Sequence, residues 1–341
     1  MAHDELVEAI EACHDAGWTD GLPVVPPTPE RVDAMLGRWR ADRDEAVAVL
    51  PPARGVATFE RIAANAVLAG CRPEHFPVVV AGIRAIARRR FLLDEVVTTV
   101  HAAAPAFVVS GPLAARIGMQ GSTGALGPGN RANVTIGRAL SLCIRNIAGG
   151  VPGKLDAATH GHPGKLGFCF TENLDLSPWD PIAVALGGEP DHTYIVAKAT
   201  DAPLCIADMG HDRAEAILAT LAASVAIPGT YNAFFREELW LVMSPEHAQV
   251  IAAEGLGRDD VARYVHEHAV IPAGRLRTSG VYGFIDDAVR QAWLDDASDD
   301  DLIPIVDRPE RVIIIVAGGP YGGYTAALFG NGRHVMERIE A

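Results

Sequence analysis

Gly118-Met-Gln-Gly-Ser-Thr-Gly-Ala-Leu-Gly-Pro-Gly-Asn-Arg131 is the stretch around which the chain is organised. Its five glycines and one proline predict a loop, because neither residue favours the interior of a helix or strand. Residues 132–147 follow with apolar side chains at helical spacing, which predicts an amphipathic helix. A glycine-rich loop that leads into a helix directs free backbone N–H groups at one point, where the helix dipole also favours an anion.

We therefore expect this loop to bind a small anionic substrate, with Arg131 adding a forked donor from the first helical turn. The expected substrate-binding residues of the loop are Gly124, Gly127, Gly129, Asn130, Arg131 and Asn133. Arg138 and Arg145 follow at seven-residue intervals, and their simplest interpretation is a solvated helix face. The loop lacks the Gly-Lys-Ser/Thr ending of a P-loop, and it does not closely match the dinucleotide pattern Gly-x-Gly-x-x-Gly.

The composition is that of a globular protein. The 341 residues suffice for one large or two medium domains, and 49% of them are hydrophobic and 21% charged. A formal net charge of −14 argues against nucleic acid as the main partner and against anionic membranes. No apolar run approaches the roughly 20 residues that a membrane span needs. An acidic chain that binds an anion must do so through a local basic pocket. The net charge therefore makes the glycine-rich loop, with its arginine, a more important candidate for the anion-binding site.

Strands and helices alternate irregularly, which predicts an α/β or α+β fold with a layered mixed sheet and flanking helices. Residues 1–175 would form an N-terminal lobe with the loop and a His-Gly-His motif, and residues 176–341 a C-terminal α/β lobe; a single domain is the alternative. Expected helices are 2–16, one beginning after Thr28, 58–69, 71–87, 132–147, 213–226, 245–254 and 259–268. Expected strands are 96–100, 106–110, 166–173, 194–199, 204–208, 239–243 and 311–317.

The five cysteines are widely spaced and odd in number, which favours free thiols in a reducing cytoplasm. The acidic, amphipathic N-terminus is unlike a signal peptide. Cys71 precedes an expected helix start and lies next to Arg72, two features that lower a thiol pKa, so it is the best candidate nucleophile. The alternative is that Cys71 is a small buried residue at a tight turn between helices. Cys169, between two phenylalanines, is interpreted as buried and structural.

The segment from Asp156 to Glu172 is the densest group of chemically active side chains. His160 and His162 lie two residues apart, so in an extended segment both imidazoles can point the same way and chelate one divalent metal. The carboxylate of Asp156, or alternatively that of Glu172, would complete the set of ligands. Alternatively His160 or His162 acts in acid–base chemistry, with Glu172 assisting, or binds an anion, or both histidines are structural. Lys165 is a further candidate for binding a substrate carboxylate.

Five segments of the chain form a distinctive set: Trp18-Thr-Asp-Gly-Leu-Pro-Val-Val-Pro-Pro-Thr28, Leu68-Ala-Gly-Cys-Arg-Pro-Glu74, Thr123-Gly-Ala-Leu-Gly-Pro-Gly-Asn-Arg-Ala-Asn133, Thr159-His-Gly-His-Pro-Gly-Lys165 and Gly318-Gly-Pro320. Together they resemble a poorly characterised bacterial family associated with small UGSC-motif (seleno)proteins. The chain carries no Cys-Gly-Ser-Cys itself. The resemblance therefore implies that a redox thiol or selenol would come from a separate Cys/Sec partner protein.

These patterns lead to two functional hypotheses. The first is a hydrolase or lyase that acts on a small anionic metabolite by histidine acid–base chemistry, with or without a divalent metal. The second is a substrate-binding subunit of a thiol/selenol redox system; a binding protein without turnover is a third possibility. We expect a cytoplasmic homo-oligomer in which the two glycine-punctuated segments, 120–133 and 156–172, fold into a single positively lined cleft.

Overall fold

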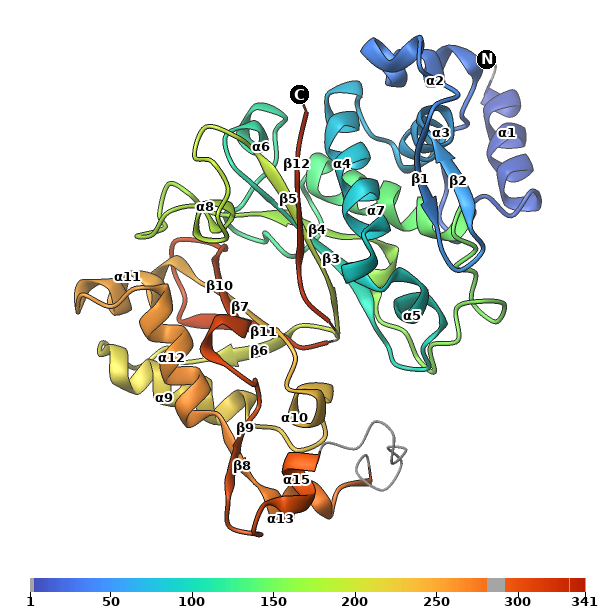
Figure 1. The fold of residues 1–341 in the computed structure, drawn as a ribbon. Coiled ribbons are helices and arrows are strands. Elements are labelled where there is room, and N and C mark those ends of the chain that lie inside the picture. Colours follow the sequence, from blue (N-terminus) through green and yellow to red (C-terminus); the bar gives the residue numbers. More distant parts are fainter. Residues whose placement is uncertain (1–2, 281–291, 331, 341) are drawn as a thin grey trace. The chain divides into compact units, whose positions relative to one another are not determined.

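The computed structural model describes residues 3–280, 292–330 and 332–340 (Figure 1). Contacts between Cα atoms divide the chain into two compact units. Unit 1 comprises Met1–Glu172, Pro181–Ala199 and His334–Ala341, and unit 2 comprises Asn173–Asp180 and Thr200–Arg333. Mixed sheets with flanking helices confirm the α/β or α+β class expected from the sequence.

The central sheet of unit 1 has four strands. Their order is β12 (Val335–Arg338), β5 (Tyr194–Thr200), β3 (Ala104–Ser110) and β4 (Phe168–Thr171). β3 and β4 run parallel, and β12 runs antiparallel to β5. β3, β4 and β5 are buried along their whole length, which explains why β3 and β4 are apolar at successive rather than alternate positions. β5 also carries the buried Lys198.

Helices and one hairpin complete unit 1. They are α1 (His3–Asp15), α2 (Pro29–Leu36), α3 (Phe59–Ala69), α4 (Phe76–Ala87), α5 (Leu93–Thr98), α6 (Leu113–Arg116), α7 (Arg131–Asn146), α8 (Ile182–Ala185), the short 3-10 helices η1 (Gly37–Arg40), η2 (Pro73–His75), η3 (Arg89–Phe91) and η4 (Pro163–Leu166), and the hairpin strands β1 (Ala46–Leu50) and β2 (Gly55–Thr58). The side chains of Thr28 and Thr58 cap α2 and α3 by accepting a backbone N–H. The start of α2 after Thr28 is the one that the sequence predicted.

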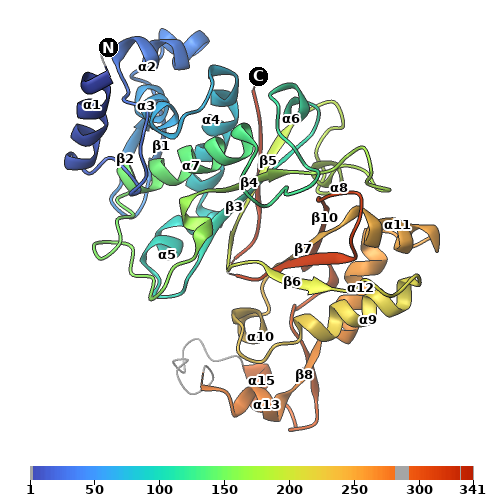
Figure 2. The same cartoon turned by 180° about the vertical axis from the view of Figure 1, so that it is seen from behind.

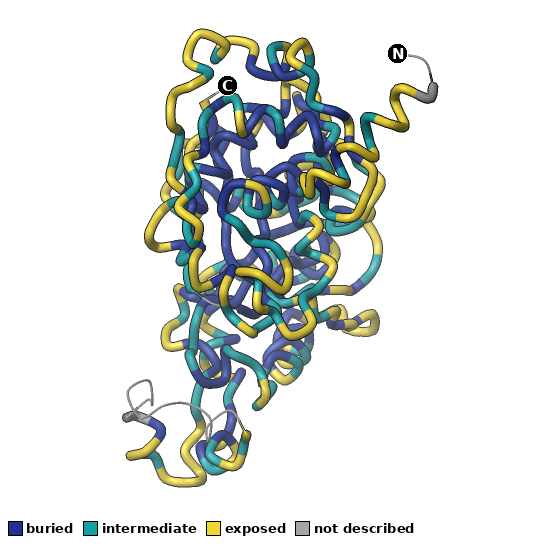
Figure 3. Tube along the Cα trace, turned by 90° about the vertical axis from the view of Figure 1, so that its right-hand side faces the viewer, coloured by how far each residue is buried: buried dark blue, intermediate teal, exposed yellow. Residues whose placement is uncertain are grey.

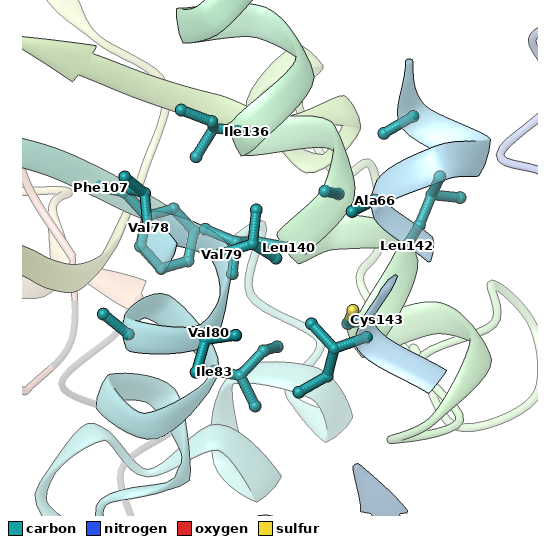
Figure 4. Packing of buried hydrophobic residues seen from close by; sticks show 14 of the residues in the cluster. Ala66, Val78, Val79, Val80, Ile83, Phe107, Ile136, Leu140, Leu142 and Cys143 are labelled. Carbon is teal, nitrogen blue, oxygen red and sulfur yellow. The ribbon is translucent and has the colours of Figure 1, made fainter. Parts of the chain in front are cut away.

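α7 supplies the crossover that the parallel strands β3 and β4 require. It lies unusually close to β4, because a Cβ on Gly167 would come within 2.5 Å of the Arg138 nitrogen. A Cβ on Gly137 would come within 3.0 Å of the Phe168 nitrogen. α7 also packs against α3 and α4, and Figure 4 shows Leu140 of α7 beside Val79 of α4. Close packing through glycine thus brings α7 against the segment that leads into β4.

Unit 2 is built on a second four-stranded sheet, seen from behind in Figure 2. Its strand order is β10 (Val312–Val316), β7 (Leu239–Met243), β11 (Tyr324–Leu328) and β6 (Leu204–Ala207), with β10 parallel to β7 and β11 antiparallel to β7 and β6. The other elements are α9 (Ala214–Val225), α10 (Tyr231–Phe235), α11 (Pro245–Ala253), α12 (Arg258–His268), α13 (Ala273–Arg277), α15 (Ala292–Asp296), η5 (Pro309–Arg311) and the antiparallel pair β8 (Val270–Pro272) and β9 (Leu302–Pro304). α12 packs against both α9 and β10.

Each unit has its own buried apolar cluster, and Figure 3 traces the buried residues along the chain. Among the described residues, no helix combines the length and apolarity that crossing a bilayer requires. The strand expected at 96–100 is wrong, because residues 93–98 form α5. Buried Leu93, Val96 and Val97 fall at helical spacing there, and acidic residues occupy the first turn, which favours a helix despite the β-branched side chains.

Candidate functional site

A cavity of about 200 Å³ lies within unit 1, beside the loop that joins α7 to β4. Its apolar lining consists of Val96, Val97, Ala103, Pro105, Ile144, Gly150, Pro152 and Leu166. Its polar lining consists of Asp20, Ser141, Arg145, Asp156, His162 and Lys165. Three of the residues expected from the sequence to carry chemistry, Asp156, His162 and Lys165, therefore lie around one space.

Asp156 and Lys165 form a close ion pair at the cavity. The Lys165 Nζ lies 2.7 Å from both carboxylate oxygens of Asp156, and the two side chains are largely withdrawn from solvent. One of those oxygens also accepts the backbone N–H of Ala158 at 3.1 Å, which closes a local turn. Lys165 is therefore a neutralised cation that fixes the loop, rather than a free donor for substrate.

The two histidines of the His-Gly-His motif are separated by the conformation of the glycine between them. Gly161 has φ +64, in the left-handed region, so the segment is not extended there and the two imidazoles need not face one way. His162 lines the cavity, whereas His160 is exposed and is absent from its lining. His162 Nδ1 accepts the backbone N–H of Gly164 at 3.2 Å, so a neutral ring carries its proton on Nε2.

The metal site expected at His160, His162 and Asp156 finds no support in this geometry. Within residues 3–280, 292–330 and 332–340, no group of three or more His, Cys, Asp or Glu side chains is placed to hold a metal ion. The Asp156 carboxylate already holds the Lys165 ammonium with both oxygens. A metal ion would have to displace that ammonium, so these residues do not fit the expected metal centre.

The sequence analysis expected Arg138 of α7 on a solvated helix face, but the structure places it in a largely buried ion pair. Its guanidinium donates to Asp20 at 2.7 and 2.8 Å, and both side chains are only about an eighth exposed (13% and 12%). It also donates to the carbonyls of Leu22 and Pro23, which ties the extended N-terminal segment to α7. Burial alone would raise the pKa of Asp20, but the hydrogen bonds and charge of Arg138 outweigh it and hold that pKa below its usual value.

Arg145, one heptad further along α7, is the unpaired cation of the cavity. It is half-buried, its Nε atom is buried without a hydrogen-bond partner, and no described residue forms an ion pair with it. A buried donor without a partner costs about 1–3 kcal/mol, so this guanidinium gains from an added acceptor. Arg145 also borders a larger hollow of about 970 Å³, where the flanking polar side chains pair with each other, as Asn65 does with Asn146 at 2.7 Å.

The glycine-rich loop 118–130 contributes no residue to the lining of the 200 Å³ cavity. Its polar side chains bind the loop's own backbone instead. Asn133 is buried, and its amide group donates to the Gln120 carbonyl at 2.9 Å and accepts the Gln120 N–H at 3.2 Å. Asn130 caps α7 through the Asn133 N–H and donates to the Gly118 carbonyl. The two glycine-punctuated segments therefore do not share this cavity.

The remaining expected loop residues also have structural contacts. Arg131 donates from Nε and a terminal nitrogen to the Gly70 carbonyl at 3.2 and 3.0 Å. Gly124 and Gly129 adopt positive φ of +74 and +122, with open space where a Cβ would lie, so they serve the turns. Gly127 closes a turn by donating its N–H to the Gly124 carbonyl.

Cys71 and Glu172 are not placed for the chemistry expected of them. Burial raises the pKa of the Cys71 thiol to about 12, and its Sγ donates to the Thr135 carbonyl, so burial disfavours the expected thiolate. Cys71 is a buried residue, as the alternative interpretation expected. Glu172 is buried and accepts the Ser110 hydroxyl and the Ile182 N–H, which holds the start of α8. It does not line the cavity.

Sequence reasoning missed two charged residues that line this site, Asp20 and Arg145. Asp20 is the single acid in the apolar, proline-rich stretch 18–28, which was a usable signal. Arg145 carried no such signal, because a helical projection places it opposite the apolar stripe. Its position follows from the loop 150–166, which covers that side of α7 and borders the cavity.

A second pair of titratable side chains lies in unit 2. His211 Nδ1 lies 2.8 and 2.9 Å from the two carboxylate oxygens of Asp208, which follows β6. The Asp208 side chain is buried, whereas that of His211 is 54% exposed. The backbone carbonyl of Asp208 is held by the buried His247 at 2.9 Å. Asp208 thus orients an accessible imidazole, a feature that the sequence analysis did not identify.

Comparison with protein-family models, curated proteins and solved structures found no match to this chain. The function is therefore inferred from the geometry of the site.

Proposed function

We propose that the 200 Å³ cavity of unit 1 binds a small anionic metabolite through Arg145. We further propose that it is the site of hydrolytic or lyase-type chemistry in which His162 transfers a proton. The observation that carries this proposal is the half-buried guanidinium of Arg145, which has no partner in the described part of the chain and lies on the same cavity as His162. Arginine presents planar, paired donors that match a carboxylate or phosphate.

The ring nitrogens of His162 support a role as proton donor. Because Nδ1 accepts the Gly164 N–H, the neutral imidazole presents Nε2–H as its donor. Gly164 lies so close to the ring that a Cβ added at this position would come within 2.5 Å of the imidazole Cε1. This close contact restricts the orientation of the His162 ring. A ring held in one orientation suits proton transfer to a bound leaving group.

Two matched pairs of variants test this proposal. His162→Gln should abolish turnover of a substrate found by screening small carboxylates and phosphate esters, while His160→Gln, on the exposed side of the motif, should keep it. Arg145→Met should weaken binding about 10- to 100-fold, the loss expected for charge-assisted hydrogen bonds. Arg90→Met, an exposed arginine outside the cavity, should leave affinity unchanged. Full turnover in the His162→Gln protein would remove this residue from the reaction.

The second hypothesis, a substrate-binding subunit of a thiol/selenol redox system, is favoured by the state of the cysteines in unit 1. Cys71, Cys143 and Cys169 are buried, and burial raises the pKa of each thiol. Redox chemistry at this unit would therefore need a partner's thiol or selenol, as the resemblance implies. Co-purification with such a protein, together with turnover only in its presence, would support this hypothesis over an independent enzyme.

A further inference from the structure

We infer that the ligand of the unit 1 cavity is a monocarboxylate with an apolar body, rather than a dicarboxylate or a phosphate ester. This inference rests on the proposed function, because it names the ligand class of the same cavity. It is carried by the balance of charges around the cavity and by the nature of the remaining lining.

The charges of the cavity cancel in pairs and leave one cation. Asp20 is held by two hydrogen bonds from Arg138, and both oxygens of Asp156 bind the Lys165 ammonium. Arg145 is then the one charged lining residue without a partner among the residues that the structure describes. A single carboxylate satisfies it. A second negatively charged group on the ligand would lose its hydration next to the Asp20 and Asp156 carboxylates, and no unpaired cation of the lining would be left to bind it.

The rest of the lining favours an apolar body on the ligand. Val96 and Val97 come from α5, and Pro105 from β3. Ile144 precedes Arg145 on α7, and Leu166 is the last residue of η4, in the segment that joins α7 to β4. The volume of about 200 Å³ equals that of roughly seven water molecules in the liquid, which suits a carboxylate with a short hydrocarbon chain or one ring. Each buried methylene adds about 0.8 kcal/mol to binding.

The test is a binding series on the full chain by titration calorimetry at pH 7.5. The probes are hexanoate, adipate, acetate and hexanamide, which separate charge number from chain length. Hexanoate should bind at least tenfold more tightly than adipate, acetate or hexanamide. Arg145→Met should remove most of the preference for hexanoate over hexanamide, and Arg90→Met should keep it. Leu166→Ser, at a side chain already 45% exposed, should weaken hexanoate severalfold and leave acetate unchanged.

Asp156→Asn provides a gain-of-function arm. The asparagine keeps an oxygen for the Ala158 N–H but frees the Lys165 ammonium, so the cavity gains one unpaired positive charge. Adipate should then approach or exceed hexanoate in affinity. Recovery of adipate binding in this variant would be hard to explain by shape, because asparagine and aspartate are nearly isosteric.

The outcomes separate this inference from the proposed function. Tighter binding of adipate than hexanoate in the unaltered protein, lost in Arg145→Met, would overturn the monocarboxylate assignment and keep the anion site. Binding of no probe, or binding insensitive to Arg145→Met but lost in Arg116→Met, would overturn both. Arg116 lines a different pocket of unit 1, together with Arg38 and Arg338. A loss of binding in Arg116→Met would therefore show that the probes bind in that pocket instead.

Discussion

The segments 118–130 and 149–167 of unit 1 are both rich in glycine, yet they use glycine in different ways. In the first, Gly129 takes a left-handed φ with open space around its Cα, and the polar side chains hold the loop's own backbone. In the second, Gly167 takes a similar φ of +148 but lies against the backbone of α7. The first segment is a self-contained turn structure, whereas the second brings His162 and Lys165 to a cavity bordered by α7.

Glycine content alone therefore does not identify a ligand-binding loop. What distinguishes the two segments is whether their polar groups already have partners. Asn130, Arg131 and Asn133 are satisfied by backbone groups of unit 1, which leaves little for an anion. Arg145 beside the second segment is unsatisfied, so binding energy remains available there.

The largest expected difference between the two segments is the loss of stability when a glycine is replaced by alanine, which adds a Cβ. Gly167→Ala places that atom 2.5 Å from the Arg138 nitrogen in a left-handed conformation, so strain and overpacking together should lower the free energy of unfolding by about 3–5 kcal/mol. Gly129→Ala meets only the conformational strain and should cost about 1–2 kcal/mol. Urea unfolding of both variants measures the difference, and equal losses would contradict the distinction between turn and packing glycines.

A smaller effect is expected from the ion pair between Asp20 and Arg138, which ties the N-terminal segment to α7 beside the second segment. Asp20→Asn should lower the free energy of unfolding by about 2–3 kcal/mol at pH 7, because it leaves the largely buried Arg138 guanidinium without its carboxylate. The folded-state pKa of Asp20 lies below its usual value, so its stabilising contribution is complete above the unfolded-state pKa of about 3.9. That contribution is lost as the pH falls through the folded-state pKa.

The gap between the unaltered protein and Asp20→Asn should therefore be constant from pH 7 to about pH 5 and shrink below about pH 4. Urea unfolding at pH 7, 5 and 3.5 gives the gap directly. A gap that widens in acid would mean that Asp20 is not held by Arg138 in solution.

The sequence predicted those elements whose signals are local. β7 has the predicted bounds, Leu239–Met243, and α7 begins one residue before the predicted helix. β11 and β12 were missed, because they are short and their burial alternates or ends in exposed residues, so neither gives a continuous apolar run. Strand order could not be read at all, since β12 pairs with β5 from a distant part of the chain.

The same division holds for the site. Asp156, His162 and Lys165 are close in sequence, and their grouping was predictable from spacing. The contributions of Asp20 and Val97 depend on how distant segments pack, and a helical projection assigned Arg145 to solvent. The local pattern thus identified one wall of the cavity, whereas the tertiary structure was needed to place the Arg145 guanidinium on it.

A third prediction separates stability from binding in the first segment. Asn133→Ala should lower the free energy of unfolding by about 2 kcal/mol, because it leaves the Gln120 N–H and carbonyl without their partner. It should leave hexanoate affinity unchanged, whereas Arg145→Met should weaken that affinity with little loss of stability. The two variants are compared by urea unfolding and titration calorimetry on the same preparations. A loss of ligand affinity in Asn133→Ala would return the glycine-rich loop to the binding site.

The smallest effect concerns Cys71, which lies beside the first segment and donates to the Thr135 carbonyl of α7. With a pKa of about 12, only about one thiol in ten thousand is ionised at pH 8. A thiol-specific chromogenic disulfide should therefore react quickly with one of the five cysteines of the native protein, the exposed Cys205, and with all five after denaturation. Cys205→Ser should remove the fast phase, and Cys71→Ser should not change it. A second fast thiol that disappears in Cys71→Ser would mean that the region around the first segment opens in solution, and Cys71 would again be a candidate nucleophile.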